Sequence, residues 1–502
     1  MSLSSQFYSA LIGSTVIKIG LAVFIPLTSD EAYFFVLGKY LDYGYYEHPP
    51  MAGWLIHFLL YGGDSRLILR LPNIFFGIII GLALYQFLKR TDKKKAQILA
   101  VLFWISPFNL LNVIITNDAP LTLFTFLSGL LFFKGFEVEK KVKNYFLLSG
   151  IFLGLAFFSK YFAVLLAGAF LGYVLIFQRN RRGINAILWT FWPAAFFVLL
   201  NLYWNYTHCW DNIVFNFFVR HQDPIQFSLI NFIFFLAGQI YLITPVVFYY
   251  LLKDRKSIRE NLETGHFFII PLVLYGVPLL ILAFLSFFIL IGLHWTLSFI
   301  PFAFIIFFIV FSPQTLRRMV KPMVLFSAGH LLLILAALLL FQAGKFEKLD
   351  LYKNTIISIK AREICSLLKP VRDGFLLTSE SYDDVSMLQY YCGQFVTQFG
   401  KGSKHGRQFD KLTDFSRYQD KNILIVRGGS PNEDFFRKFF EKIEIKENRI
   451  GDHPVFFIFG YKFKYTVYKE KILREILVSF YQIPSWLPCG DCYFKDHYFG
   501  RN

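Results

Sequence analysis

The chain has 502 residues, of which 55% are hydrophobic and 17% are charged, and its formal net charge is +17. This composition excludes an ordinary water-soluble globular protein and is typical of a polytopic membrane protein. Most of the basic excess lies in short loops between apolar segments, so we expect contact with membrane lipids and no nucleic acid partner.

Apolar segments follow one another along the first 345 residues. A helix that crosses a bilayer needs roughly 20 mostly apolar residues. Eleven segments fit this length approximately, and we predict spans at 8–27, 67–88, 98–115, 119–136, 145–159, 162–177, 184–206, 230–252, 266–291, 295–311 and 322–343. The first segment lacks a basic start and a small-residue cleavage site, which indicates a retained span rather than a signal peptide.

The loops between these segments alternate in charge. With a cytoplasmic amino terminus, the inside loops contain 18 Lys and Arg residues, whereas the outside loops contain only Lys39, Arg66, Lys160 and Arg220. Lys and Arg are retained on the cytoplasmic side of spanning helices. This asymmetry therefore predicts that residues 28–66 lie outside the membrane.

Charged residues become frequent after about residue 345. Short β-like runs occur at 374–378, 422–427 and 455–459, and helical patterns occur at 353–368, 382–391 and 433–442. We therefore predict a transmembrane domain over residues 1–344 and an α/β domain over 345–502. Eleven spans place the second domain outside the cytoplasm. The basic, aromatic tail at 463–502 matches no element pattern.

The five cysteines carry little information on their own. Cys365 and Cys392 fall in the predicted α/β domain, and Cys209 lies at a membrane boundary. Cys489 and Cys492 form a CxxC pair, for which an oxidising compartment favours a disulfide. An unpaired structural role and metal or redox chemistry are the alternatives.

The first external loop contains the strongest candidates for chemistry. Asp30 and Glu31 directly follow the first span, and Glu47 and His48 follow an aromatic stretch. Adjacent carboxylates at a bilayer surface are suited to act as a general base or to hold a cation. The alternative is a helix start, with Ser29 as the amino-terminal cap and both acids in the first turn.

The loop string DEAYFFVLGKYLDYGYYEHPP resembles the first external loop of the GT-C glycosyltransferases, which include protein O-mannosyltransferases and lipid A aminoarabinose transferases. Four later strings resemble elements of the same superfamily in the same order: ITNDAP at 115–120, FSKY at 158–161, LYWNYTHCW at 202–210 and GLHW at 292–295. The resemblance extends over about residues 8–345 and implies a GT-C fold.

The resemblance also implies roles for single residues. Asp30 is expected to take the proton from the acceptor hydroxyl, with Glu31 beside it and Asp118 as the second acidic group near the reacting carbon or the acceptor. Glu47 and His48 stand where aminoarabinose transferases carry Glu-Lys, whose lysine contacts the donor phosphate. A histidine makes that charge pH-dependent. The remaining candidates for binding donor phosphate or substrate are Lys160, Tyr161, Asn205, Arg220 and His294.

Each of these candidates has a structural alternative. Asp118 is also suited to cap the fourth span, and Lys160 to reach the membrane interface with its amine. His208 and His294 stand beside tryptophans, which is typical of interfacial aromatic residues. The polar stretch 220–223 is also compatible with a solvated loop.

We therefore expect an inverting glycosyltransferase that uses a polyprenyl-phosphate sugar donor. The expected acceptor is an envelope molecule such as lipid A, lipopolysaccharide core, another glycolipid or a protein, and the expected location is the bacterial inner membrane with the α/β domain in the periplasm. No cofactor or metal ligand is required by the sequence, and a divalent cation at the acidic and histidine cluster stays open.

A secondary transporter or a lipid-linked sugar flippase is the runner-up, since intramembrane carboxylates also carry protons and cations. The carboxylates, however, lie at the ends of spans and no internal repeat is evident. A receptor or assembly protein that binds through its soluble domain is the third class.

Overall fold

The computed structural model describes residues 2–220, 226–255, 258–259, 269–488 and 490–500. The chain forms two compact units, each assembled from separate stretches of sequence. Unit 1 contains Met1–Pro26, Gly62–Leu200 and Pro224–Ala337, and unit 2 contains Leu27–Tyr61, Asn201–Asp223 and Leu338–Asn502. The first external loop and the segment after residue 200 therefore belong to the same unit as the carboxyl-terminal region.

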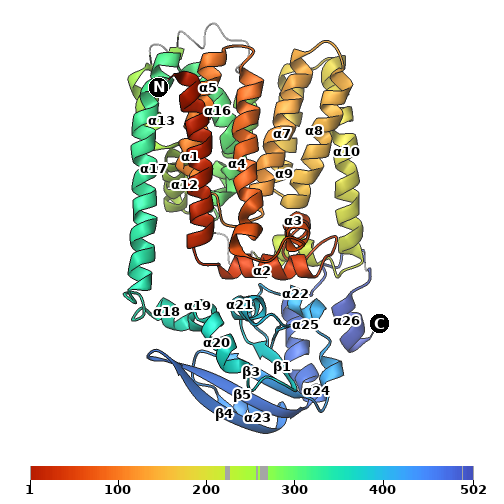
Figure 1. Cartoon of the computed structure of the whole chain (residues 1–502). Coiled ribbons are helices and arrows are strands. Elements are labelled where there is room, and N and C mark those ends of the chain that lie inside the picture. The colour runs from red at the N-terminus through yellow and green to blue at the C-terminus, as the bar shows by residue number, and fades with distance from the viewer. Residues whose placement is uncertain (1, 221–225, 256–257, 260–268, 489, 501–502) are drawn as a thin grey trace. The chain divides into compact units, whose positions relative to one another are not determined.

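Unit 1 is helical, and its long helices run side by side (Figure 1). Its helices are α1 (Leu3–Phe24), α4 (Arg66–Leu88), α5 (Lys93–Ile105), α6 (Pro107–Leu110), α7 (Asp118–Glu137), α8 (Val142–Ser159), α9 (Ala163–Phe177), most of α10 (Arg181–Tyr206), α12 (Leu229–Ile243), α13 (Pro245–Lys253), α15 (Ile269–Leu285), η3 (Leu293–Trp295), η4 (Leu297–Phe299), α16 (Ile300–Val310) and most of α17 (Pro313–Gln342).

The predicted spans coincide with these helices. Within the described residues, seven helical stretches are long and apolar enough to cross a membrane, and the α12–α13 pair makes an eighth if it is one span. They are α1, α4, α7, α8, α10, Leu293–Val310 and α17. The other three predicted spans correspond to α5 with α6, to α9 and to α15, which are shorter. The polytopic membrane class is thus confirmed.

Two predicted spans are interrupted by proline. The span predicted at 98–115 ends as a helix at Ile105, and Pro107 starts the short helix α6. The span predicted at 230–252 bends by 89° between α12 and α13, where Thr244 has φ 76° and precedes Pro245. Proline lacks a backbone N–H and disfavours helical geometry in the residue before it, which gives a physical reason for both breaks.

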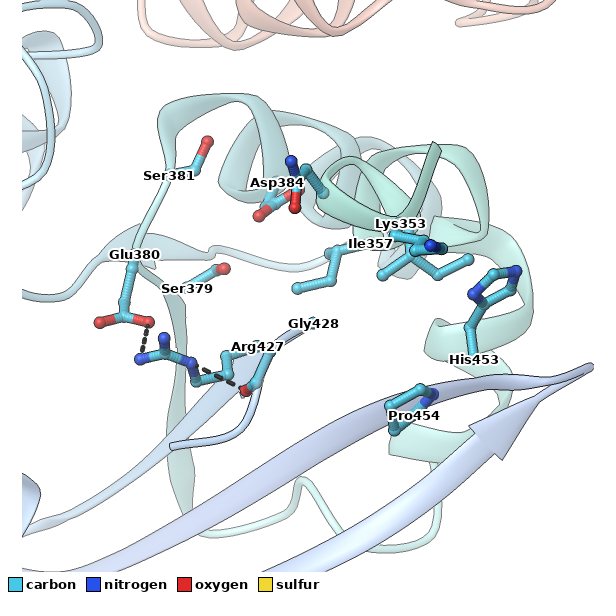
Figure 2. A pocket seen from close by; sticks show the side chains of 13 residues that line it. Lys353, Ile357, Ser379, Glu380, Ser381, Asp384, Arg427, Gly428, His453 and Pro454 are labelled. Atoms are coloured by element: carbon cyan, nitrogen blue, oxygen red, sulfur yellow. Dashed lines mark hydrogen bonds and ion pairs between the residues drawn. The ribbon is translucent and has the colours of Figure 1, made fainter. Parts of the chain in front are cut away.

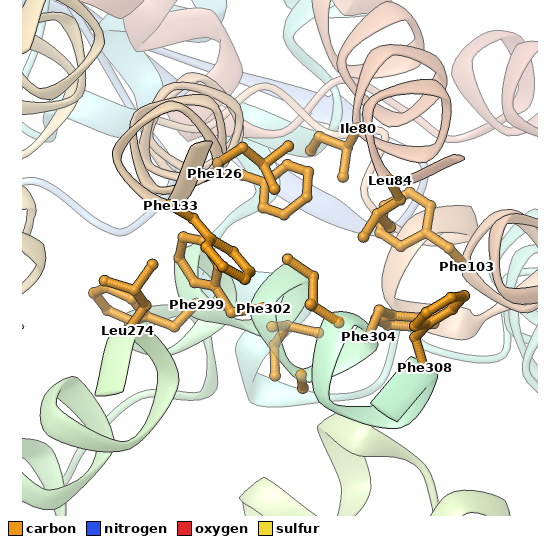
Figure 3. Close-up of a cluster of buried hydrophobic side chains, with 14 of the residues drawn as sticks. Ile80, Leu84, Phe103, Phe126, Phe133, Leu274, Phe299, Phe302, Phe304 and Phe308 are labelled. Carbon is orange, nitrogen blue, oxygen red and sulfur yellow. The ribbon is translucent and has the colours of Figure 1, made fainter. Parts of the chain in front are cut away.

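Phenylalanine side chains dominate the core of unit 1 (Figure 3). Phe126 on α7 and Phe302 on α16 have ring centroids 5.5 Å apart, and Phe103 on α5 packs edge-on against Phe304 at 5.2 Å. Aromatic pairs at these distances add about 1 kcal/mol each beyond simple burial. The core therefore joins helices from the two ends of the unit's sequence.

Two arginines of α4 fix the end of α1. The fully buried Arg70 donates from Nη1 to the carbonyls of Ala22 and Ile25 at 2.9 and 2.8 Å, and Arg66 Nη1 donates to Ile25 at 3.1 Å. The last carbonyls of a helix have no hydrogen-bond partner within the helix. A cation at this end also interacts favourably with the negative end of the helix dipole. The carboxyl-terminal end of α1 is thereby held against α4.

Unit 2 combines short helices with one sheet. Before the carboxyl-terminal region it contains α2 (Ser29–Lys39), α3 (Met51–Leu60), α11 (Asp211–Val214) and the π-helix η1 (Phe215–Val219). The later helices are α18 (Asp350–Asn354), α19 (Ile356–Ile359), α20 (Ala361–Leu368), α21 (Tyr382–Cys392), α22 (Gln408–Leu412), η5 (Phe415–Tyr418), α23 (Glu433–Arg437), α24 (Tyr465–Tyr468), η6 (Lys469–Leu473), α25 (Arg474–Phe480) and α26 (Tyr493–Phe499).

The sheet has the strand order β2-β1-β3-β5-β4. Its strands are β1 (Phe375–Ser379), β2 (Thr397–Gln398), β3 (Asn422–Arg427), β4 (Phe440–Ile450) and β5 (His453–Phe463). Strands β1, β2 and β3 are parallel, whereas β5 is antiparallel to both β3 and β4. Helices α19, α20 and α21 pack against one another beside this sheet (Figure 1).

Two predictions for this region need correction. The helix expected at 433–442 ends at Arg437, because residues 440–450 form β4 and pair with β5. Strand β4 alternates exposed Lys and Glu with partly buried apolar residues, which is typical of a protected edge strand. The same charged residues also suit the end of a surface helix, and the sequence pattern therefore predicts the wrong element here. The helix expected at 353–368 is broken into α18, α19 and α20, and the unassigned tail forms α24, η6, α25 and α26.

Both disulfides lie in unit 2. Cys209 pairs with Cys492 across 283 residues, and Cys365 pairs with Cys392 across 27. The favoured Cys489–Cys492 pairing is therefore wrong, because the Cys492 sulfur is bonded to Cys209. Cys489 itself lies outside the described residues. The long-range bond holds the tail helix α26 to the segment that follows α10.

Candidate active site

Helix α2 begins with a capping box that fixes the first acidic pair. Thr28 is the N-cap: its side-chain oxygen accepts the Glu31 N–H at 3.3 Å, and Glu31 Oε2 accepts the Thr28 N–H at 3.1 Å. The structural alternative named the wrong cap, since Ser29 is already inside the helix. Glu31 is fully buried and takes part in the capping box. Asp30 lies in the same helical turn but does not take part in the capping box.

Asp30 is the accessible carboxylate of the pair. The Tyr382 hydroxyl donates to its Oδ1 at 3.3 Å, and both residues belong to unit 2. Although the residue is exposed, surrounding protein raises the pKa of Asp30 by desolvation, and the neighbouring Asp383 carboxylate raises it further. The Tyr382 hydrogen bond and His405 oppose this rise. A carboxylate with a raised pKa is a better proton acceptor near neutral pH.

Glu47 is buried and links the first external loop to the carboxyl-terminal region within unit 2. Its Oε2 accepts the Tyr33 hydroxyl at 2.6 Å, and its Oε1 accepts the backbone N–H groups of Gly406 and Arg407. Burial raises the pKa of Glu47 to about 7, and these hydrogen bonds limit the rise. The geometry therefore favours a positioning role for Glu47.

His48, next to it in sequence, is half-buried. Its ring lies 5.5 Å from that of Phe34, centroid to centroid, and its carbonyl accepts the Tyr45 N–H at 2.9 Å. The Tyr45 hydroxyl in turn donates to the carbonyl of Leu37 at 2.8 Å. The turn that carries Glu47 and His48 is thus tied back to α2.

Basic residues from two distant parts of unit 2 lie together near Arg220. The Lys404 amine donates to the Arg220 carbonyl at 3.1 Å. The cations of Arg220 and Lys404, together with burial, lower the pKa of His405, while Asp30 raises it. Residues 221–223, which complete the predicted polar stretch, lie outside the described residues. Sequence inspection missed Tyr382, Lys404 and His405 because they stand more than 300 residues after Asp30.

The Trp-Asn-His-Trp element at 202–210 holds unit 2 together. The fully buried Asn205 donates from its side chain to the Asn201 carbonyl at 2.9 Å and accepts the Ile213 N–H at 3.1 Å. Trp204 donates to Asp42 Oδ1 at 2.9 Å and stacks on His208 at 4.5 Å. These contacts favour a structural role for Asn205, and its predicted contact with substrate stays a prediction.

Unit 1 contains the second group of predicted site residues. Asp118 is the first residue of α7, and Lys160 directly follows α8. Lys160 Nζ lies 2.8 Å from Asp118 Oδ1, and the two side chains are 17% and 11% exposed. Lys160 was expected to offer its charge to a phosphate, but in this structure a carboxylate already neutralises that charge in part.

Aromatic residues surround this ion pair. Lys160 Nζ lies 5.0 Å from the centroid of the Phe162 ring, and Phe162 packs edge-on against Trp295 at 4.8 Å. His294, beside Trp295 in the short helix η3, is exposed. The Tyr161 ring packs on Phe157 at 5.0 Å. Asp118, Lys160, Tyr161 and His294 thus fall in one unit, while Asp30, Glu31, Glu47, His48, Asn205 and Arg220 fall in the other.

A divalent cation would need several acidic or histidine ligands at one point. Over the part of the chain that the structure describes, no group of three or more His, Cys, Asp or Glu side chains has such an arrangement. The metal and cofactor expectations stay predictions.

The fold and these residues define a polytopic membrane protein with carboxylates beside cations at the ends of its helices. The family model of dolichyl-phosphate-mannose-protein mannosyltransferases matches residues 47–204. The lipid A galacturonosyltransferase RgtD of Rhizobium johnstonii is 25% identical over 248 residues, which is 46% of this chain and 51% of that protein. The chain thus matches about half the length of this relative.

Solved structures agree on the fold. The crystal structure of ArnT from Cupriavidus metallidurans in the apo state has a TM-score of 0.62 at 14% identity, and the structure bound to undecaprenyl phosphate has 0.63 at 13%. Both alignments cover 91% of this chain and 98% of that chain. The chain has the GT-C fold, and its predicted resemblance to the GT-C glycosyltransferase superfamily is confirmed.

Proposed function

We propose that this protein is an inverting glycosyltransferase that moves a sugar from a polyprenyl-phosphate donor to an acceptor in the cell envelope. The observation that carries the proposal is the setting of Asp30. This carboxylate is held in the first turn of α2 by the Thr28 capping box, is accessible, and has a raised pKa. These are the properties that a general base for a hydroxyl nucleophile needs.

The compared proteins support the kind of donor and acceptor. The matching family model is named for a dolichyl-phosphate-linked mannose donor, and one ArnT structure contains undecaprenyl phosphate. RgtD is named for transfer to lipid A. We infer a lipid-phosphate sugar as donor here and an envelope glycolipid as the acceptor, with lipid A or lipopolysaccharide core as the leading cases.

In the proposed reaction, Asp30 takes the proton from the acceptor hydroxyl as the hydroxyl oxygen bonds to the anomeric carbon. The bond between that carbon and the phosphate oxygen breaks, and its electron pair leaves with the polyprenyl phosphate. Attack from the face opposite the leaving group inverts the anomeric configuration. Cationic groups then stabilise the charge that develops on the phosphate.

Three cationic side chains are proposed for the leaving phosphate. In unit 1 the candidate is Lys160, whose amine forms an ion pair with Asp118. In unit 2 the candidates are Arg220, which lies beside Lys404, and His48, whose charge depends on protonation.

The proposed location is the bacterial inner membrane, with the α/β region in the periplasm. The support is the ratio of 18 inside to 4 outside Lys and Arg residues in the loops. A cysteine introduced near Lys93 should be protected from a membrane-impermeant thiol reagent in intact cells with a permeabilised outer membrane, whereas one near Gly402 should react. The reverse pattern would contradict this orientation.

The function itself is tested with the purified protein in liposomes that contain a polyprenyl-phosphate sugar and lipid A. We expect release of free polyprenyl phosphate together with a lipid A product heavier by one sugar. A flippase would instead move the intact donor between leaflets without releasing polyprenyl phosphate, and that result would contradict the proposal.

A further inference from the structure

The α/β region contains a cavity that the proposed reaction does not use. It has a volume of about 530 Å³ and lies among residues that follow β1, residues that follow β3, helices α18 and α19, and the start of β5 (Figure 2). All of its lining residues belong to unit 2. Pockets for small ligands typically have volumes of about 300–1,000 Å³.

Sheet topology explains why a cavity forms at this position. The chain passes from β1 to β2 on one side of β1 and then returns to β3 on the other side. The connections therefore diverge at the carboxyl ends of the neighbouring parallel strands β1 and β3. In open α/β sheets, ligands bind at such a switch point, outside the carboxyl ends of the strands.

Polar side chains line one wall of the cavity. Arg427 Nη1 lies 2.8 Å from Glu380 Oε2, and the two side chains are 29% and 35% exposed. The Arg427 Nε–H donates to the Gly429 carbonyl at 2.9 Å, which fixes the guanidinium (Figure 2). Asp384 accepts a hydrogen bond from the Ser358 hydroxyl at 2.8 Å. Donors and acceptors thus alternate along this wall.

Apolar side chains also line the cavity. Ile356 and Ile357 come from α19, and Pro454 comes from the start of β5. Gly428 permits the close approach of α19, because a Cβ atom at that position would lie 2.8 Å from Ile356 Cγ2. A ligand in the cavity would therefore contact both polar groups and apolar surface.

The charges of the cavity are nearly balanced. Lys353 and Arg427 bring two positive charges, and Glu380 and Asp384 bring two carboxyl groups. Burial raises the pKa of Asp384 to about 7, so this group both donates and accepts hydrogen bonds near neutral pH. Equal numbers of basic and acidic groups favour neither an anion nor a cation, whereas a neutral ligand with many hydroxyl groups would satisfy donors and acceptors alike.

His453 provides an independent sign of an unfilled polar site. Its Nε2 atom is buried and has no hydrogen-bond partner in the described part of the chain. His453 lines the cavity at its edge near Lys353, and its ring packs against that of Tyr352 at 5.3 Å, centroid to centroid (Figure 2). Buried polar atoms are nearly always hydrogen-bonded, so this nitrogen is an unsatisfied polar group in a residue that lines the cavity.

We propose that this cavity is a binding site for a neutral saccharide. The hydroxyl groups of the sugar bond to Glu380, Asp384 and Arg427, and its C–H face packs on Ile357 and Pro454. In an envelope glycosyltransferase the site would hold a neutral sugar of the acceptor glycan, and this second step rests on the proposed function.

Binding is tested on the full-length protein in lipid nanodiscs, free of maltoside detergents, by saturation-transfer difference NMR. The probes are glucose, galactose, mannose and N-acetylglucosamine, with galacturonate and inorganic phosphate as anionic competitors. We expect transfer to the ring protons of at least one neutral sugar, and a signal at least fivefold weaker in the isosteric variant Glu380→Gln.

A matched control is Glu444→Gln, which removes an exposed carboxylate that pairs with Lys442 on β4. This variant should keep the wild-type signal, and both variants should keep the wild-type melting temperature. Absence of a signal in the wild type, an equal signal in Glu380→Gln, or displacement of the sugar by phosphate would each overturn the proposal.

In the transfer assay, Glu380→Gln should raise KM for the glycan-bearing acceptor and leave KM for the donor unchanged. Sugar binding without any transferase activity would refute the proposed function and leave the site intact.

Discussion

The two units that contain the predicted acids surround their carboxylates with different partners. Asp30, at the start of α2 in unit 2, has a tyrosine hydroxyl as its polar partner and a raised pKa. Asp118, at the start of α7 in unit 1, forms an ion pair with Lys160 at 2.8 Å. Both acids lie in the first turn of a helix, but among the described residues Asp118 is paired with a lysine, whereas Asp30 accepts a hydrogen bond from a tyrosine. This difference supports the proposal that Asp30 transfers the proton and that the Asp118–Lys160 pair organises charge.

The largest expected effect is that of Asp30→Asn. Loss of a general base should lower turnover by at least about 100-fold, because such groups typically contribute 10²–10⁴-fold. Release of polyprenyl phosphate by purified protein measures the change. The control is Asp434→Asn, which removes an exposed carboxylate from the first turn of α23 and should leave turnover unchanged. Near-normal turnover in Asp30→Asn would contradict its role as the base and make Asp118 the next candidate.

A smaller effect is expected at the ion pair. Lys160→Met leaves Asp118 as an unpaired, nearly buried charge, so it should lower the melting temperature and raise the donor KM by about tenfold. Adding Asp118→Asn removes that charge and should restore most of the melting temperature. The measurement is a double-mutant cycle on stability and on donor kinetics. Simple additivity of the two changes would show that the residues act independently.

The pH dependence of transfer should respond in opposite directions to two changes near Asp30. The base acts when deprotonated, so the rate rises with pH through its pKa. Tyr382→Phe removes a hydrogen bond that lowers the pKa of Asp30 and should shift this rise to higher pH. Asp383→Asn removes a carboxylate that raises the same pKa and should shift it to lower pH. The measurement is the pH profile of kcat/KM for each variant. If both profiles shift in the same direction, or if neither shifts, the pKa of Asp30 does not control the rate.

The smallest expected effect concerns stability at Glu47. Its pKa is about 7 in the folded protein and about 4.3 in an unfolded chain. Glu47 therefore binds its proton more tightly in the folded state than in the unfolded chain. The stability that this difference contributes is fully present below about pH 4.3 and is lost as pH rises through about 7. In Glu47→Gln, the melting temperature should fall less between pH 5 and pH 8 than in the wild type.

Glu444→Gln serves again as the exposed control and should show the wild-type fall. Asp384 has a similar pKa, so Glu47→Gln should remove only part of the dependence. A wild-type fall in the Glu47 variant would show that its carboxyl group is already ionised at low pH.

Much of the fold could be predicted from local sequence. Long apolar segments define spans because the backbone finds no hydrogen-bond partner in lipid. The breaks at Pro107 and Pro245 were not predicted, because Pro72, Pro193, Pro278 and Pro322 lie within continuous helices and proline alone does not mark a break. Strand β4 was missed because its alternating charges suit an edge strand as well as a helix surface. The Cys209–Cys492 bond was missed because nothing local links two cysteines that are 283 residues apart.

The candidate site was predictable only in part for the same reason. Asp30 stood out because two acids directly follow an apolar segment. Tyr382, Asp383 and His405 shape its pKa, but they come from a region whose sequence reads as an ordinary soluble domain. The pairing of Asp118 with Lys160 depends on how α7 and α8 pack, which spacing alone does not specify.

The most direct test of the central claim is mass spectrometry of envelope glycolipids from cells that carry the wild-type gene, no gene or the Asp30→Asn allele. We predict a glycolipid heavier by one sugar in the wild type alone, with the variant protein present in the membrane at the normal amount. An unchanged glycolipid profile after gene loss, or a full product level with Asp30→Asn, would contradict the assignment of this protein as a glycosyltransferase that uses Asp30 as its base.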